Sequence, residues 1–314
     1  MAKKKKNQEN LPEGMSRRQA KLAARAAERA KLQKDPRPYD GFAMEASLIA
    51  LQEFVPSAYF EAEVAGAERP VRIVTVLPGA VSAIVRDEGE GTGAAAGVGF
   101  VALQSQRRGD NPNRDLAYAL NWVKNAKPGE SLEVGVADGT EPALTDLLDK
   151  SMEAPITVAQ DFNWWLTEEQ QNNPQVVATL QQANDSVLPS DKVAADISGE
   201  AWWINPSEKA HIRWVRQEKE AELLNALARL HAAGELHLGE GSKFAGVFRT
   251  HGVLVPVWDL DNSKDPDDWA EGLEALDKKL AEKLAAEADG SAAELTGDEH
   301  KAKQTIVSRE VTIR

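Results

Sequence analysis

The sequence predicts an α+β fold made of two similar helix–strands–helix halves. Its 314 residues, 42% of them apolar, are enough to bury one large core or two small ones. Segments with apolar residues at helical spacing alternate with short runs rich in Val and Ile, and this order of segments recurs in the second half. We expect the chain to be organised as a basic N-terminal arm, disordered and then helical, over 1–38, a first half over 39–149, a tryptophan-rich connection over 150–215, a second half over 216–285 and a mostly disordered polar tail over 286–314.

The basic arm is set apart from the rest of the chain by its charge. Residues 1–38 hold 12 Lys and Arg against 4 Asp and Glu, whereas the remaining residues hold 25 against 46. Ser16 and Gln19 form a capping-box pattern at the start of a segment, 17–34, that is rich in strong helix formers. Because Lys and Arg bind phosphates without any sequence requirement, we expect this segment to contact RNA, DNA or a ribosome. The candidate contact residues are Arg17, Arg18, Lys21, Arg25 and Arg29.

Two other interpretations of the arm stay open. It is either a solvated helix that aids solubility or a docking segment for an acidic protein partner. A membrane surface is excluded as its target, because Leu22 and Leu32 alone make no bulky apolar face.

The first half begins with a helix over 44–54, in which Leu48, Leu51 and Val55 have helical spacing. Short strands are expected over 71–77, 82–85 and 98–104, followed by a helix over 115–125. The glycine-rich loop before Val98 contains Gly91-x-Gly93-x-x-Ala96, which matches a dinucleotide fingerprint in form. That motif needs a helix directly after it, whereas the residues after this loop are typical of a strand, so we interpret the loop as a hairpin connection.

The second half repeats this plan. A helix is expected over 220–231, strands over 243–249 and 253–260, and a further helix from Pro266. The segment Glu45-Ala46-Ser47-Leu48 aligns with Glu220-Ala221-Glu222-Leu223, which suggests a tandem duplication. A chance recurrence of common elements is the alternative.

Two pairs of adjacent tryptophans mark the connecting region. Neighbouring residues in a strand point to opposite faces, so each pair is expected to place one ring in the core and one outside it. An outward ring is a candidate anchor for a protein partner, while core packing is the alternative for all four rings. The candidate partner-binding residues are Trp164, Trp165, Trp202 and Trp203.

No catalytic, cofactor or metal motif is evident in the sequence. The absence of cysteine excludes disulfides, thiolate zinc sites and cysteine nucleophiles, and the five histidines form no His-x-x-x-His pair. The aspartates between 259 and 268 lack EF-hand spacing and suit a helix N-terminus. We therefore predict no cofactor and a non-enzymatic adaptor. The alternative is an enzyme whose site is assembled between the halves from Asp110, His251, Asp259 and Asp261.

The location predicted by the sequence is the cytoplasm. No apolar run approaches the roughly 20 residues that a membrane span needs. The lysines at the N-terminus precede polar residues, so they do not begin a secretory signal.

Three segments carry a resemblance to a known family. They are Glu13-Gly14-Met15-Ser16-Arg17-Arg18-Gln19-Ala20-Lys21-Leu22-Ala23, Leu230-His231-Ala232-Ala233-Gly234-Glu235 and Leu254-Val255-Pro256-Val257-Trp258-Asp259-Leu260. Over residues 13–285 the chain resembles an actinobacterial family of unknown function, some members of which are labelled as preprotein translocase or topoisomerase proteins. Neither label is carried over, because the chain has no nucleotide-binding motif, no tyrosine nucleophile context and no cysteine-based zinc tail. The resemblance implies a cytosolic bacterial protein and assigns no functional residue.

Overall fold

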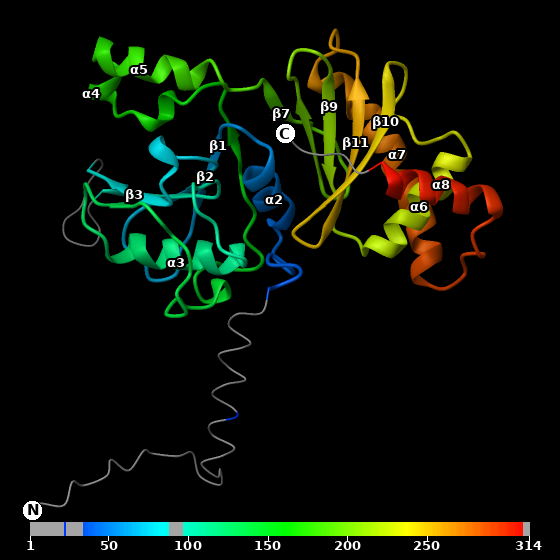
Figure 1. The fold of residues 1–314 in the computed structure, drawn as a ribbon, viewed down its shortest axis with the longest axis horizontal. Coiled ribbons are helices and arrows are strands. Elements are labelled where there is room, and N and C mark those ends of the chain that lie inside the picture. The colour runs from blue at the N-terminus through cyan, green and yellow to red at the C-terminus, as the bar shows by residue number, and fades with distance from the viewer. Residues whose placement is uncertain (1–21, 23–33, 88–96, 310–314) are drawn as a thin grey trace, which may run out of the picture. The chain divides into compact units, whose positions relative to one another are not determined.

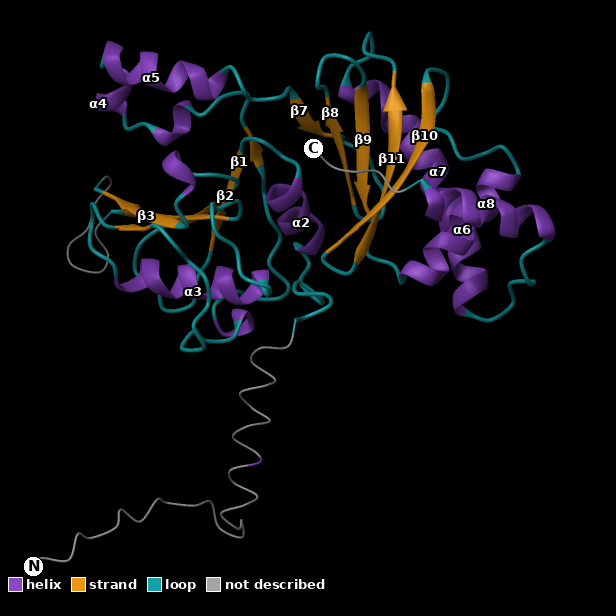
Figure 2. Cartoon of the chain, viewed as in Figure 1, coloured by secondary structure: helices purple, strands orange, loops and turns teal. Residues whose placement is uncertain are grey.

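The computed structural model describes residue 22 and residues 34–87 and 97–309 (Figure 1). The chain divides into a unit over 1–35 and a unit over 36–314. The second unit combines two sheets with helices, which confirms the predicted α+β class (Figure 2). The five basic candidates of the arm lie outside the described residues.

The first sheet, sheet A, has six strands in the order β5-β3-β4-β2-β1-β6. β2 and β4 pair in parallel, and the other neighbours are antiparallel. Two helices, α2 and α3, lie against its inner face and share its core. The bounds of these elements are α2 (Glu45–Glu53), β1 (Ala58–Ala62), β2 (Val71–Val74), β3 (Ala83–Arg86), β4 (Val98–Ala102), α3 (Pro112–Asn125), β5 (Ser131–Leu132) and β6 (Thr157–Val158).

The second sheet, sheet B, has five antiparallel strands in the order β10-β11-β9-β8-β7. A helical excursion, α4 and α5, precedes it in the chain, and α6, α7 and α8 pack on one of its faces. The bounds are α4 (Glu168–Gln171), α5 (Pro174–Asn184), β7 (Ser190–Lys192), β8 (Glu200–Ile204), β9 (Ala210–Val215), α6 (Glu220–Ala232), β10 (Ser242–Thr250), β11 (Val253–Leu260), α7 (Ala270–Ala288) and α8 (Gly297–Ser308).

Both faces of sheet B are buried, which joins the two halves. Trp202 and Val257 point into the core that α2, α3 and sheet A share, while Trp203 and Trp258 point into the core under α6 and α7. Helix α2 contacts β8 and β9, so it lies between the two sheets (Figure 1). Every helix among the described residues is too short or too polar to span a bilayer.

The predicted tail is wrong in part, because α8 folds onto the second half. Its Thr296 caps the helix by accepting a hydrogen bond from the Glu299 backbone, and Ala302 and Ile306 are buried against α6 and β10. The composition of this segment resembles that of a disordered chain, because it is mostly polar. Only two side chains of α8 are buried in the core.

Within the described residues, the elements predicted for the two halves recur with small shifts in their ends. β4 follows the glycine-rich loop directly and pairs with β3 as a hairpin, which confirms a strand where a dinucleotide site needs a helix. The loop itself, 88–96, lies outside the described residues. The duplication stays a prediction: the strands of the first half include a parallel pair, β2 and β4, whereas β10 and β11 of the second half pair antiparallel.

A buried ion pair holds the start of the folded unit to both halves. Arg37 donates two hydrogen bonds of 2.7 Å to the carboxylate of Glu45, which is 1% exposed. It also donates to the Gln217 carbonyl, and the Gln217 side chain donates to Glu45. Next to this pair, a Cβ added at Gly252 would lie 2.3 Å from the Pro36 carbonyl oxygen, so the β10–β11 turn tolerates no side chain there.

We predict that Arg37→Ala lowers the free energy of unfolding by about 3 kcal/mol, because the buried Glu45 carboxylate loses its counter-ion. Urea denaturation of the full chain measures this. Lys219→Ala is the control, since Lys219 is 81% exposed in its pair with Glu222 and its loss is expected to cost about 0.5 kcal/mol or less. Equal losses in the two variants would contradict a clamping role for Arg37.

Candidate functional site

The structure does not bring the four residues of the enzyme alternative together. His251 lies in the turn before β11, and Asp259 lies at the far end of that strand, so extended geometry separates them by roughly 25 Å. Asp110 is exposed and precedes α3 in the other half. Asp261 accepts hydrogen bonds from the hydroxyl and backbone N–H of Ser263, which lower its pKa and occupy it in a local turn.

The four tryptophans form no common groove. Trp202 and Trp203 point to opposite faces of β8 as predicted, but α6 and α7 cover the face that was expected to be outside. Both rings are therefore buried, 0% and 8% exposed, and neither is available to a partner.

Trp164 and Trp165 lie in a short 3-10 turn, Asn163–Trp165, rather than in a strand. The Trp164 indole N–H donates to the Ser57 hydroxyl, and the Trp165 N–H donates to the Val76 carbonyl. The Arg86 guanidinium donates to the carbonyl oxygens of both tryptophans. These bonds fasten the turn to the outer face of sheet A, so the half-buried rings act in packing.

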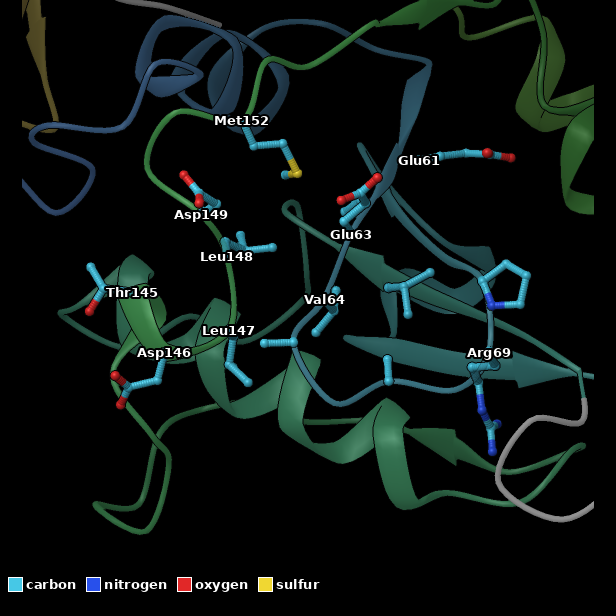
Figure 3. Close-up of a pocket in the computed structure, with 15 residues that line it drawn as sticks. Glu61, Glu63, Val64, Arg69, Thr145, Asp146, Leu147, Leu148, Asp149 and Met152 are labelled. Carbon is cyan, nitrogen blue, oxygen red and sulfur yellow. The ribbon is translucent and has the colours of Figure 1, made fainter.

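The candidate site that the structure does present is an open pocket of about 790 Å³ beside sheet A (Figure 3). One wall comes from the end of β1 and the chain after it, and the other comes from residues 145–152. A backbone hydrogen bond of 2.8 Å from Ala65 to Leu147 joins the two walls. The floor is apolar, formed by Ala62, Val64, Val71, Leu147, Leu148 and the partly buried Met152.

The rim of this pocket, the acidic rim, consists of Glu61, Glu63, Asp146 and Asp149, all of them exposed. Asp149 accepts hydrogen bonds from the Ser151 hydroxyl and backbone N–H, which lower its pKa and keep it ionised. Glu61 also pairs with Arg72 at 3.1 Å. Figure 3 shows Glu63 and Asp149 on opposite walls of the pocket.

Among the described residues that line the pocket, the basic one is Arg69, which is 4% exposed and donates to the Ala126 carbonyl at 2.7 Å. Burial lowers its pKa. Arg69 is therefore engaged in the protein interior. In the described part of the chain, the carboxylates at the mouth of the pocket without an ion pair are those of Glu63, Asp146 and Asp149, since Glu61 is paired with Arg72.

An acidic rim above an apolar floor suits a ligand with an apolar stem and a cationic head. Lysine and arginine side chains have this form, because their methylene stems pack on apolar surface while their charges stay at the rim. A metal ion fits less well, since the described residues contain no group of three metal-ligating side chains.

Sequence reasoning missed this pocket because its walls lie about 80 positions apart in the chain and meet only through tertiary pairing. The alternation of Glu61 and Glu63 at the end of a strand was the one available signal. It indicates an exposed acidic face but not the wall opposite it.

The chain belongs to the DUF5926 family, a family of unknown function, whose sequence signature covers residues 38–314. No curated protein and no solved structure shows significant similarity to it. The basic arm lies before this signature, and the pocket and both sheets lie within it.

We predict that Trp164→Ala lowers the free energy of unfolding by about 3 kcal/mol, because it removes packing on Tyr59 and the bond to Ser57. Val177→Ala on α5, where the valine is 39% exposed, is the control and is expected to change stability by about 0.5 kcal/mol or less. A Trp164→Ala chain as stable as this control would return Trp164 to the candidate docking residues.

Proposed function

We propose that this DUF5926 protein is a non-enzymatic adaptor whose basic arm contacts nucleic acid or a ribosome while its folded unit holds a partner. The observation that carries this proposal is the separation of charge. The arm holds 12 basic against 4 acidic residues, and the rest of the chain holds 25 against 46.

The acidic excess of the folded unit supports confining nucleic-acid contact to the arm. A body rich in Asp and Glu repels phosphates, whereas Lys and Arg in the arm release counter-ions when they bind them. The expected contacts are sequence-independent, and five basic residues at 17, 18, 21, 25 and 29 make them.

The pocket supports the second contact of the adaptor. Its acidic rim and apolar floor complement a lysine- or arginine-bearing segment of a protein partner, because such a segment satisfies both surfaces at once. The buried tryptophan pair of β8 takes no part in this contact.

We predict that replacing Arg17, Arg18, Lys21, Arg25 and Arg29 by Gln in the full chain abolishes RNA and DNA binding at physiological salt. Fluorescence anisotropy across a salt series measures it. For duplex DNA, the slope of log affinity against log salt is expected to fall by about four to five, because five phosphate contacts are lost.

The matched control for the arm changes the same number of charges on the folded unit. It replaces exposed basic residues for which the structure shows no ion pair among the described residues, namely Arg107, Lys127, Lys243, Lys278 and Lys301. This control is expected to bind as the unaltered chain does. Equal losses in both variants would show a net-charge effect, and retained binding in the arm variant would remove the arm from the proposal.

We predict that neutralising the acidic rim, with Gln at Glu61 and Glu63 and Asn at Asp146 and Asp149, weakens binding of a labelled lysine-rich peptide by roughly tenfold or more. Four exposed charges each contribute a fraction of a kcal/mol to the attraction, and about 1.4 kcal/mol is a factor of ten. Fluorescence anisotropy at fixed ionic strength provides the measurement.

The control for the rim replaces four other exposed glutamates by Gln, and it carries the same change in net charge. They are Glu169, Glu208, Glu282 and Glu294. If both variants lose affinity alike, the peptide senses only the overall acidity and the pocket is not its site.

A further inference from the structure

A second feature lies away from the acidic pocket, on the face of sheet B that points toward α2. Arg213 occupies β9, where it is level with Trp202 on β8 and Val257 on β11. Its guanidinium carbon lies 5.4 Å from the centre of the Phe54 ring, at the end of α2. The side chain is half-buried, and within residues 34–87 and 97–309 the structure shows no hydrogen bond or ion pair that it makes.

Other arginines in similar surroundings carry their own anions. Arg216, the residue directly after β9, is 1% exposed and pairs with both Glu218 and Asp277. Arg37 pairs with the buried Glu45. Withdrawing a guanidinium from water without such a partner is costly, and burial alone lowers the pKa of Arg213 to about 10. The ring of Phe54 offsets only part of that cost.

The neighbours of Arg213 on the same face are also basic. Lys209 and His211 precede it at alternate positions, and alternate residues of a strand share a face. Both contact the carboxylate of Asp259. The Lys209 ammonium lies 3.4 Å from one of its oxygens, and the His211 Nδ1 lies 3.2 Å from the other. Burial lowers the pKa of His211 despite this acid, and the positive charge of Arg213 contributes to the lowering. Lys209 and His211 thus share a single carboxylate, and Arg213 has no part in that pairing.

We propose that Arg213, supported by His211, binds an oxyanion group, either a phosphate or a carboxylate, on this face of sheet B. The planar guanidinium presents two parallel N–H donors that match the two oxygens of such a group, and its carbon lies over the Phe54 ring. The His211 Nε2 provides a third contact, because its Nδ1 faces Asp259. An anion here supplies the missing counter-charge. This site is independent of the arm and of the acidic pocket.

The test uses the full chain in Tris chloride and two probes, inorganic phosphate and acetate, each compared with sodium chloride at equal ionic strength. Thermal unfolding and isothermal titration calorimetry measure stabilisation and affinity. At least one probe is expected to raise the melting temperature above that in chloride. Arg213→Gln is expected to weaken its binding roughly 10- to 100-fold, because a charge-assisted pair of hydrogen bonds is lost. Stabilisation by phosphate alone assigns a phosphate group, and stabilisation by both probes extends the site to carboxylates.

Two further variants keep the result interpretable. Arg72→Gln removes an arginine that also lies over aromatic rings but is paired with Glu61, and it is expected to leave anion binding unchanged. Arg213→Lys keeps the charge without the planar fork, so it is expected to bind with intermediate affinity, and it carries the test if the Gln variant does not fold. The proposal is overturned if neither anion stabilises the unaltered chain beyond chloride, or if Arg213→Gln retains the full effect.

Discussion

A sheet that is apolar on both faces has to be covered twice, and sheet B is such a sheet. Successive residues of β8, Trp202 and Trp203, enter two different cores, so neither face can be left to water without exposing an indole. The helices α6 and α7 cover one face, and the first half, led by α2, covers the other. The two halves therefore depend on each other for burial, and the protein is built around the surface that they share.

Polar contacts also cross the surface where the two halves meet. Arg37 bridges Glu45 of α2 to Gln217 beyond β9, and Glu53 at the end of α2 lies 2.9 Å from the His251 ring in the β10–β11 turn. Each contact provides a partner for polar groups that the packing of two apolar surfaces would otherwise leave without a hydrogen bond. Arg213 lies on the same shared surface. It differs from Arg37 in that no described carboxylate forms an ion pair with it.

Strongly periodic segments were predictable, and features made by tertiary pairing were not. The β11 strand and the α6 helix occur within a residue of their expected ends, because a nearly continuous apolar run in β11 and helical apolar spacing in α6 continue to their last residues. The helix α8 and the burial of both faces of β8 were missed, since each depends on residues far away in the chain. The pocket follows the same rule: the sequence shows two glutamates at alternate positions but does not show that residues 145–152 close over them.

The fit of Gly252 against Pro36 has a mechanical consequence. The first residues of the folded unit are held between a turn that admits no side chain and a guanidinium bound to both halves. A force applied to the chain before Pro36 would therefore not simply detach these first residues from the rest of the unit. It would act in shear on the junction of the two halves, where the hydrogen bonds among Arg37, Glu45 and Gln217 must break together.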